Sequence, residues 1–228
     1  MGLSFDPSFF LYELGVAVSY LPVVALLSGV PLLGGLALGT FFALCRVYRV
    51  PFWQKFAQGY VVVMRSVPML LQMFLAYFFM KAVYGALSLS AADMDKTAIV
   101  TASLTLNAAG FLSEGVRSAL LSVERGQQEA GESVGLTQMQ IIRCLVLPQC
   151  LPVAVPVVGQ GFISIIKGSA AAYLLGVIEM IQGTAMKTAG NYRYLEAYCA
   201  TAIIYWGLTM LVERLTFALE RKVRRHAG

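Results

Sequence analysis

The chain is 228 residues long, and 13% of the residues are charged, about half of the fraction that is usual in soluble domains. Hydrophobic residues make up 58% and the mean hydropathy is +0.73, which excludes a soluble globular domain. His226 is the one histidine, so histidine-based metal centres and Ser-His or Cys-His catalysis are excluded within the chain. The sequence therefore predicts an all-α membrane protein with no catalytic residue and no metal site.

Long apolar runs predict a single domain with about five membrane-spanning helices. Asp6-Pro7-Ser8 is typical of a helix start and leads into an apolar segment that we expect to lie in the membrane interface. Basic residues follow the first long run rather than precede it, which favours a retained span over a signal peptide. The expected spans cover residues 18–44, 59–84, 97–121, 147–167 and 194–215. Residues 170–181 are expected to form a half-span or a surface helix.

The distribution of Lys and Arg predicts the orientation, because basic residues in short loops stay on the cytoplasmic side. They gather in the first loop, in the third loop and in the tail: Arg46, Arg49, Lys55, Arg125, Arg143, Arg214, Arg221, Lys222, Arg224 and Arg225. Five spans then place the N-terminus outside and the C-terminus in the cytoplasm. The basic tail is expected to contact anionic lipid headgroups of the bilayer and indicates no nucleic acid.

A polar segment, residues 122–146, is too long and too patterned to be a simple turn between the third and fourth spans. Its first half is compatible with a helix that ends at Gly135, the residue type that most easily takes the left-handed C-cap conformation. Thr137 and Gln140 then form a capping-box pattern ahead of an apolar face. These signals predict a helix–turn–helix on the cytoplasmic surface of the membrane.

This segment carries a family resemblance. The run from Arg125 to Leu136, followed by Leu147-Pro148-Gln149, closely resembles the EAA loop of ABC importer permeases of the polar amino acid (histidine, glutamine and arginine) family. Residues 64–72 resemble the family's Arg-Gly-Thr-Pro-Leu-Leu-Val-Gln segment, residues 110–117 its Ala-Tyr-x-x-Glu-x-x-Arg segment, and residues 166–169 its Lys-Asp-Thr-Ser segment. The resemblance covers about residues 55–220 and implies the type I ABC importer permease fold. The loop residues it would assign to ATPase coupling are Gly126, Glu129, Ala130, Gly131, Glu132, Gly135, Leu147 and Pro148.

The resemblance implies the membrane-spanning subunit of an ATP-driven amino acid importer in the inner membrane of a prokaryote. Its expected partners are ABC ATPase subunits, a second permease that is identical or homologous, and an extracytoplasmic substrate-binding protein. The chain has no GxxxxGK[ST] loop that would cradle nucleotide phosphates, so ATP and Mg²⁺ are expected on the ATPase. The permease is then a non-catalytic subunit without a cofactor of its own.

Two departures from the family pattern bear on this interpretation. Gly131 replaces the second Ala of the EAA triplet and is expected to loosen the loop, since Gly disfavours a helix by about 0.5–1 kcal/mol relative to Ala. Lys167-Gly168-Ser169-Ala170 lacks the acidic residue and the second hydroxyl of the family segment, which leaves a related zwitterion, such as an opine or a sulfur amino acid, as an alternative substrate. A stand-alone secondary transporter is disfavoured, because the two halves of the chain show no inverted repeat.

Ionisable residues inside spans are costly when they face lipid, so they mark candidate substrate sites. Arg65 or Lys167 would suit the carboxylate of a zwitterion and Glu114 its ammonium, and Ser169 follows Lys167 in the same segment. The alternative is that these charged groups pair with one another and fix helix packing.

Overall fold

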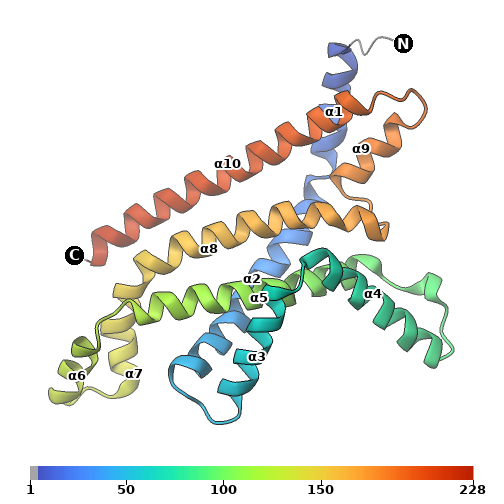
Figure 1. The fold of residues 1–228 in the computed structure, drawn as a ribbon. Helices are drawn as coiled ribbons and strands as arrows, with labels where there is room; N and C mark the ends of the chain where they lie inside the picture. The colour runs from blue at the N-terminus through green and yellow to red at the C-terminus, as the bar shows by residue number, and fades with distance from the viewer. Residues whose placement is uncertain (1–4, 228) are drawn as a thin grey trace. The chain divides into compact units, whose positions relative to one another are not determined.

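The computed structural model describes residues 5–227, and the side chains of residues 5–225. Every regular element in that range is helical (Figure 1). The bounds of the longer helices are α1 Pro7–Ser19, α2 Leu21–Val47, α3 Trp53–Ser66, α4 Met69–Ala86, α5 Lys96–Leu121, α6 Arg125–Ser133, α8 Leu147–Ser169, α9 Met180–Thr188 and α10 Tyr194–Ala227. Shorter turns are the 3₁₀ helices η1 Ala91–Asp93 and η3 Ala170–Leu175, the helix α7 Gln138–Ile141 and the π-helix η2 Ile142–Val146.

Five helical segments are long and apolar enough to cross a membrane. They are Leu21–Val47, Met69–Ala86, Lys96–Leu121, Gln138–Leu175 and Tyr194–Arg225. The predicted all-α fold with five membrane helices is therefore confirmed.

The chain forms two compact units. Unit 1 contains residues up to Leu32 together with Val67–Thr105 and Ser164–Leu211, and unit 2 contains Leu33–Ser66, Leu106–Ile163 and the residues from Val212 onward. The helices α2, α5, α8 and α10 each contribute a segment to both units.

The N-terminal helix starts where the sequence predicts. Asp6 begins α1 as predicted: its Oδ1 accepts hydrogen bonds from the backbone N–H groups of Ser8 and Phe9, at 2.9 and 3.3 Å.

The expected span 59–84 is divided into α3 and α4 at Val67-Pro68. The physical reason is Pro68, which disfavours helical backbone in the preceding residue and itself adopts φ −55° and ψ 134°.

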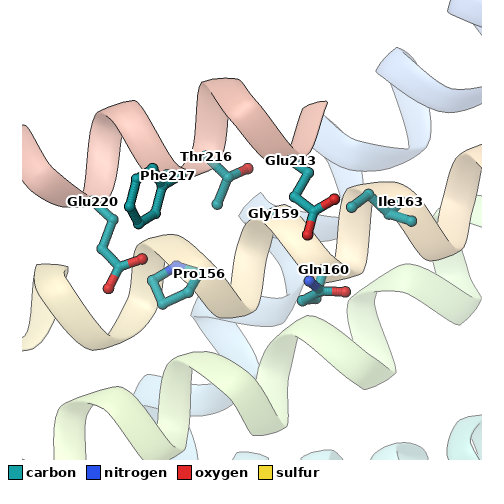
Figure 2. Close-up of a pocket in the computed structure, with 8 residues that line it drawn as sticks. All are labelled: Pro156, Gly159, Gln160, Ile163, Glu213, Thr216, Phe217 and Glu220. Atoms are coloured by element: carbon teal, nitrogen blue, oxygen red, sulfur yellow. The ribbon is translucent and has the colours of Figure 1, made fainter. Parts of the chain in front are cut away.

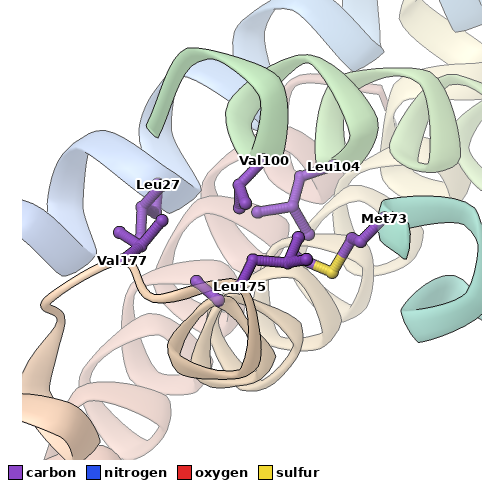
Figure 3. Packing of buried hydrophobic residues seen from close by; sticks show 7 residues of the cluster. Leu27, Met73, Val100, Leu104, Leu175 and Val177 are labelled. Atoms are coloured by element: carbon purple, nitrogen blue, oxygen red, sulfur yellow. The ribbon is translucent and has the colours of Figure 1, made fainter. Parts of the chain in front are cut away.

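Residues 170–181 also form neither a single half-span nor one surface helix. The 3₁₀ helix η3 ends at Gly176, whose φ of +80° is a left-handed conformation that Gly adopts without strain. A new helix, α9, then begins at Met180. This segment closes the core of unit 1, where Leu175 and Val177 pack with Leu27, Met73, Val100 and Leu104 (Figure 3).

Unit 2 is held by close helix packing. A Cβ added at Gly35 would lie 2.6 Å from Ala108 Cβ, and one at Gly39 would lie 2.9 Å from both Ala109 O and Ser113 N. The small residues of α2 thus let the backbone of α5 approach, as small-xxx-small patterns do in membranes. A second apolar cluster joins the end of α5 to the start of α8 and contains Ala119, Leu120, Val123, Ile141, Val146 and Cys150.

Candidate functional site

The polar segment folds into a helical hairpin, α6–α7, as predicted (Figure 1). Gly135 has a φ of +82°, its N–H donates to Glu132 O at 3.0 Å, and the N–H of Leu136 donates to Gly131 O at 3.1 Å. These two bonds satisfy carbonyls at the end of α6 that would otherwise be unpaired. The predicted left-handed C-cap at Gly135 is therefore confirmed.

The second arm of the hairpin starts with the predicted capping box. The N–H of Gln140 donates to Thr137 Oγ1 at 3.4 Å, and the N–H of Thr137 donates to Gln140 Oε1 at 2.8 Å. The apolar face beyond it is wound partly as the π-helix η2 rather than as an α-helix. Pro148, two residues after the end of η2, lacks an N–H, so a regular α-helical hydrogen-bond ladder is interrupted at this point. The π-helix was not predicted.

Gly131 has a packing role in the hairpin. It is buried, and a Cβ at this position would lie 2.9 Å from Leu145 Cδ1 and 3.0 Å from Ile141 Cγ1. The lack of a side chain lets α6 lie close against the second arm. This close packing offsets the low helix propensity of Gly131.

The opposite face of α6 is exposed. The other predicted coupling residues of the hairpin are exposed: Gly126, Glu129, Ala130, Glu132 and Gly135. Glu132 Oε1 also accepts a hydrogen bond of 2.7 Å from Gln138 Nε2 across the turn. Leu147 is exposed and Pro148 half-buried at the start of α8. The hairpin therefore has one face packed on its second arm and one face carrying carboxylates and small residues.

A charged pocket is the second feature of unit 2. It encloses about 520 Å³ and is lined by Arg46, Val61, Val62, Arg65, Ser66, Phe111 and Glu114. The lining comes from the end of α2, the second half of α3 and the middle of α5. Two of the four predicted path residues, Arg65 and Glu114, thus lie in one pocket.

Glu114 is held by two arginines. Arg46 Nη1 donates to Glu114 Oε2 at 2.8 Å, Arg117 Nε donates to Glu114 Oε1 at 3.0 Å, and Arg117 Nη2 pairs with the same oxygen. A substrate ammonium beside Glu114 would also lie beside both guanidinium groups. Two like charges about 4 Å apart repel by about 4 kcal/mol at an effective dielectric constant of about 20. This geometry favours the alternative in which Glu114 fixes helix packing.

Lys167 and Ser169 do not line the charged pocket. Lys167 is exposed near the end of α8, while Ser169 is fully buried and donates to Ile166 O at 2.8 Å within its own helix.

Ser169 belongs instead to a buried polar region of unit 1 that also contains Glu179 and Tyr205. Glu179 is fully buried, accepts from the N–H of Gln182 at 3.0 Å as the N-cap of α9, and accepts from the Tyr205 hydroxyl at 3.0 Å. These bonds fasten α9 to α10. A carboxylate directly before a helix was the signal that was available in the sequence.

A smaller pocket of about 160 Å³ lies between α8 and α10 in unit 2. Glu213 and Thr216 project from α10 toward Gly159 and Gln160 of α8, and Glu220 projects toward Pro156, as Figure 2 shows. Ile163 and Phe217 complete the lining. Glu220 pairs with Arg224 at 2.7 Å. None of these residues is among the predicted coupling or substrate-path residues.

Comparisons with known proteins identify the family. A sequence model of the family described as binding-protein-dependent transport system inner membrane component matches residues 35–225. The chain belongs to this family. The matched range includes both arms of the hairpin and every residue of the charged pocket, whereas α1 lies outside it.

Relatives and solved structures agree with this assignment. The permease is 30% identical over 223 residues to the probable amino-acid ABC transporter permease protein PatM of Vibrio harveyi, covering 98% of both chains. It is 32% identical over 209 residues to the L-cystine transport system permease protein TcyL of Bacillus subtilis, covering 91% of this chain and 87% of that protein.

Among solved structures, one of an amino acid ABC transporter with histidines matches with a TM-score of 0.83 at 24% identity, covering 96% of this chain and 99% of that chain. The inward-facing methionine transporter MetNI matches with a TM-score of 0.71 at 19% identity, with the same coverage. The predicted type I ABC importer permease fold and the predicted family are confirmed.

Proposed function

We propose that this permease is the membrane-spanning subunit of an ATP-driven importer of amino acids in the cytoplasmic membrane of a prokaryote. The family assignment over residues 35–225 and the amino acid relatives over nearly the whole chain support the proposal. The L-cystine permease among the relatives also supports a sulfur-containing amino acid as a second candidate within the same class.

The α6–α7 hairpin is the proposed contact with the ATPase subunits, which bind ATP and Mg²⁺. The hairpin exposes the carboxylates of Glu129 and Glu132 and also the apolar side chains of Val134 and Met139, at 75% and 56% exposure. A surface that combines apolar and charged side chains suits a protein interface. Since the hairpin continues through η2 into α8 without a loop, a displacement of the hairpin is transmitted directly to a membrane helix.

The remaining partners follow from the orientation proposed from the basic residues. The hairpin and the tail face the cytoplasm, and α1 faces the outside, where a substrate-binding protein delivers the solute. A second permease, identical or homologous, completes the path. Rigid-body rocking of the two permeases then alternates access between the two sides.

Within the permease, Arg65 is the proposed contact with the solute, and Glu114 is a positioning residue that fixes Arg46 and Arg117. Lys167 and Ser169 are proposed to lie near the solute path in unit 1. Lys167 is exposed and can contact the solute, whereas Ser169 is buried and stabilises the end of α8 through its hydrogen bond.

Co-expression with its ATPase tests the proposal. We expect the permease to co-purify with an ABC ATPase and to change that enzyme's rate of ATP hydrolysis. Glu129→Lys and Gly135→Pro are expected to keep the permease in the membrane and to lose this effect. Asp93→Lys is the matched control, because it reverses a charge at an exposed residue of η1. Full coupling in both hairpin variants would refute docking through α6–α7.

A further inference from the structure

The charged pocket of unit 2 has an excess of positive charge. Arg46, Arg65 and Glu114 line it, and Arg117 pairs with Glu114 from the same helix. The three arginines and one glutamate leave a formal charge of +2. A pocket with this charge attracts anionic groups and disfavours cations.

The carboxylate of Glu114 is already paired with arginine side chains of the chain itself. Each of its two oxygens accepts from a different arginine, Oε2 from Arg46 and Oε1 from Arg117. Among the residues that the structure describes, Glu114 is also the only acidic one that lines the pocket. The pocket therefore offers no uncommitted carboxylate to a substrate ammonium.

Arg65, in contrast to Glu114, forms no ion pair among the described side chains. It lies in the last turn of α3, and its guanidinium carbon lies 5.9 Å from the centre of the Phe111 ring. Among the side chains of residues 5–225, no carboxylate lies within 4.0 Å of the guanidinium nitrogens. The side chain is exposed, and Ser66 beside it adds a hydroxyl to the lining. A planar guanidinium with free donors is the group that binds a carboxylate with two parallel hydrogen bonds.

We propose that this pocket binds the carboxylate of the transported solute through Arg65 and Ser66, and that it makes no ion pair with the solute's ammonium. This inference rests on the proposed function, because it assigns the pocket to the solute path of an importer. It defines the substrate class at this point of the path as carboxylates, whether or not they carry an amine. Recognition of the amine is left to other parts of the transporter.

Anionic oxygen also occurs in lipid headgroups, so the test must separate a lipid phosphate from a solute carboxylate. The full-length chain is placed in nanodiscs, with its four native cysteines replaced by serine and with Val62→Cys as a reporter. Val62 lines the pocket and is 59% exposed, so a maleimide can reach the new thiol. The probes are succinate and putrescine at equal ionic strength, in discs of phosphatidylcholine alone or with phosphatidylglycerol.

We expect succinate to slow labelling several-fold in both lipids and putrescine to leave the rate unchanged. Arg65→Gln should abolish the protection, Arg65→Lys should weaken it because Lys lacks the fork of donors, and Ser66→Ala should reduce it. Arg214→Gln is the matched control, since Arg214 is exposed and lies outside the pocket, and should keep full protection.

Three results would overturn the inference: protection by putrescine, succinate protection that persists in Arg65→Gln, or slow labelling caused by phosphatidylglycerol with no effect of succinate. The same preparations are assayed for stimulation of the ATPase. Intact coupling without succinate protection would refute the pocket assignment alone, whereas absent coupling would refute the proposed function.

Discussion

Gly39 in α2 offers a direct test of the close packing in unit 2. In the structure, a Cβ at residue 39 would lie 2.9 Å from Ala109 O, 2.9 Å from Ser113 N and 3.2 Å from Leu112 Cβ. Two of these atoms belong to the backbone of α5 and have no rotamer that moves them away. Gly39→Ala must therefore separate α2 from α5.

The size of the effect follows from two opposing terms. Overpacking a well-packed contact costs about 1–3 kcal/mol, and backbone atoms place Gly39→Ala in the upper part of that range. Ala favours a helix by about 1 kcal/mol over Gly in water, but a membrane helix stays helical when the bundle comes apart, so most of that gain cancels. We expect a net loss of about 2 kcal/mol.

The matched control is Gly29→Ala on the same helix. Apart from the backbone of its own helix and its chain neighbours, no atom of the described residues lies within 4 Å of a Cβ at Gly29, so this variant should have the stability of the wild type. The assay is unfolding by sodium dodecyl sulfate in mixed micelles, followed by the fluorescence of Trp53 and Trp206. Equal midpoints for Gly39→Ala and Gly29→Ala would refute the packing argument.

Three further predictions use the same assay. Glu114→Gln should destabilise the chain by about 1.5–3 kcal/mol, because charged hydrogen bonds to Arg46 and Arg117 are lost, and an unchanged midpoint would contradict that role. Tyr205→Phe should cost about 1–3 kcal/mol, since it leaves a buried oxygen of Glu179 unpaired, while Tyr192→Phe, at a residue 81% exposed, should cost nothing. Burial raises the pKa of the Glu13 carboxyl, and the positive charge of Lys187 opposes that increase. Within the described part of the chain, neither carboxyl oxygen of Glu13 has a hydrogen-bond partner. The stabilising contribution of protonated Glu13 is then complete below the unfolded pKa and is lost as the pH rises through the raised folded pKa, by about 1.4 kcal/mol per pH unit between the two values. Glu13→Gln should remove this pH dependence of the stability. A pH dependence that persists in the variant would show that it arises from another residue.

Local signals explain what could be predicted from the sequence. The start of α1 at Asp6 and the turn of the hairpin at Gly135 and Thr137 depend on contacts within about four residues, and the structure has all three. Five apolar helices were predictable because a bilayer requires long runs of apolar residues.

Contacts between distant residues could not be predicted. The pairing of Arg46 with Glu114 joins residues 68 positions apart, and the bond between Tyr205 and Glu179 joins residues 26 positions apart. The sequence showed that Arg46 and Glu114 are charged, but it did not show that they pair. Gly131 is a similar case, because its value depends on Ile141 and Leu145 across the turn rather than on helix propensity.

Uptake into proteoliposomes tests the central claim most directly. The permease is reconstituted with its ATPase, and the cognate binding protein is added outside with a radiolabelled amino acid. We predict accumulation that requires ATP and the ATPase and that is lost in Glu129→Lys, while Asp93→Lys retains it. If the permease without the ATPase accumulates the amino acid as fast as the complete transporter does, the account is contradicted.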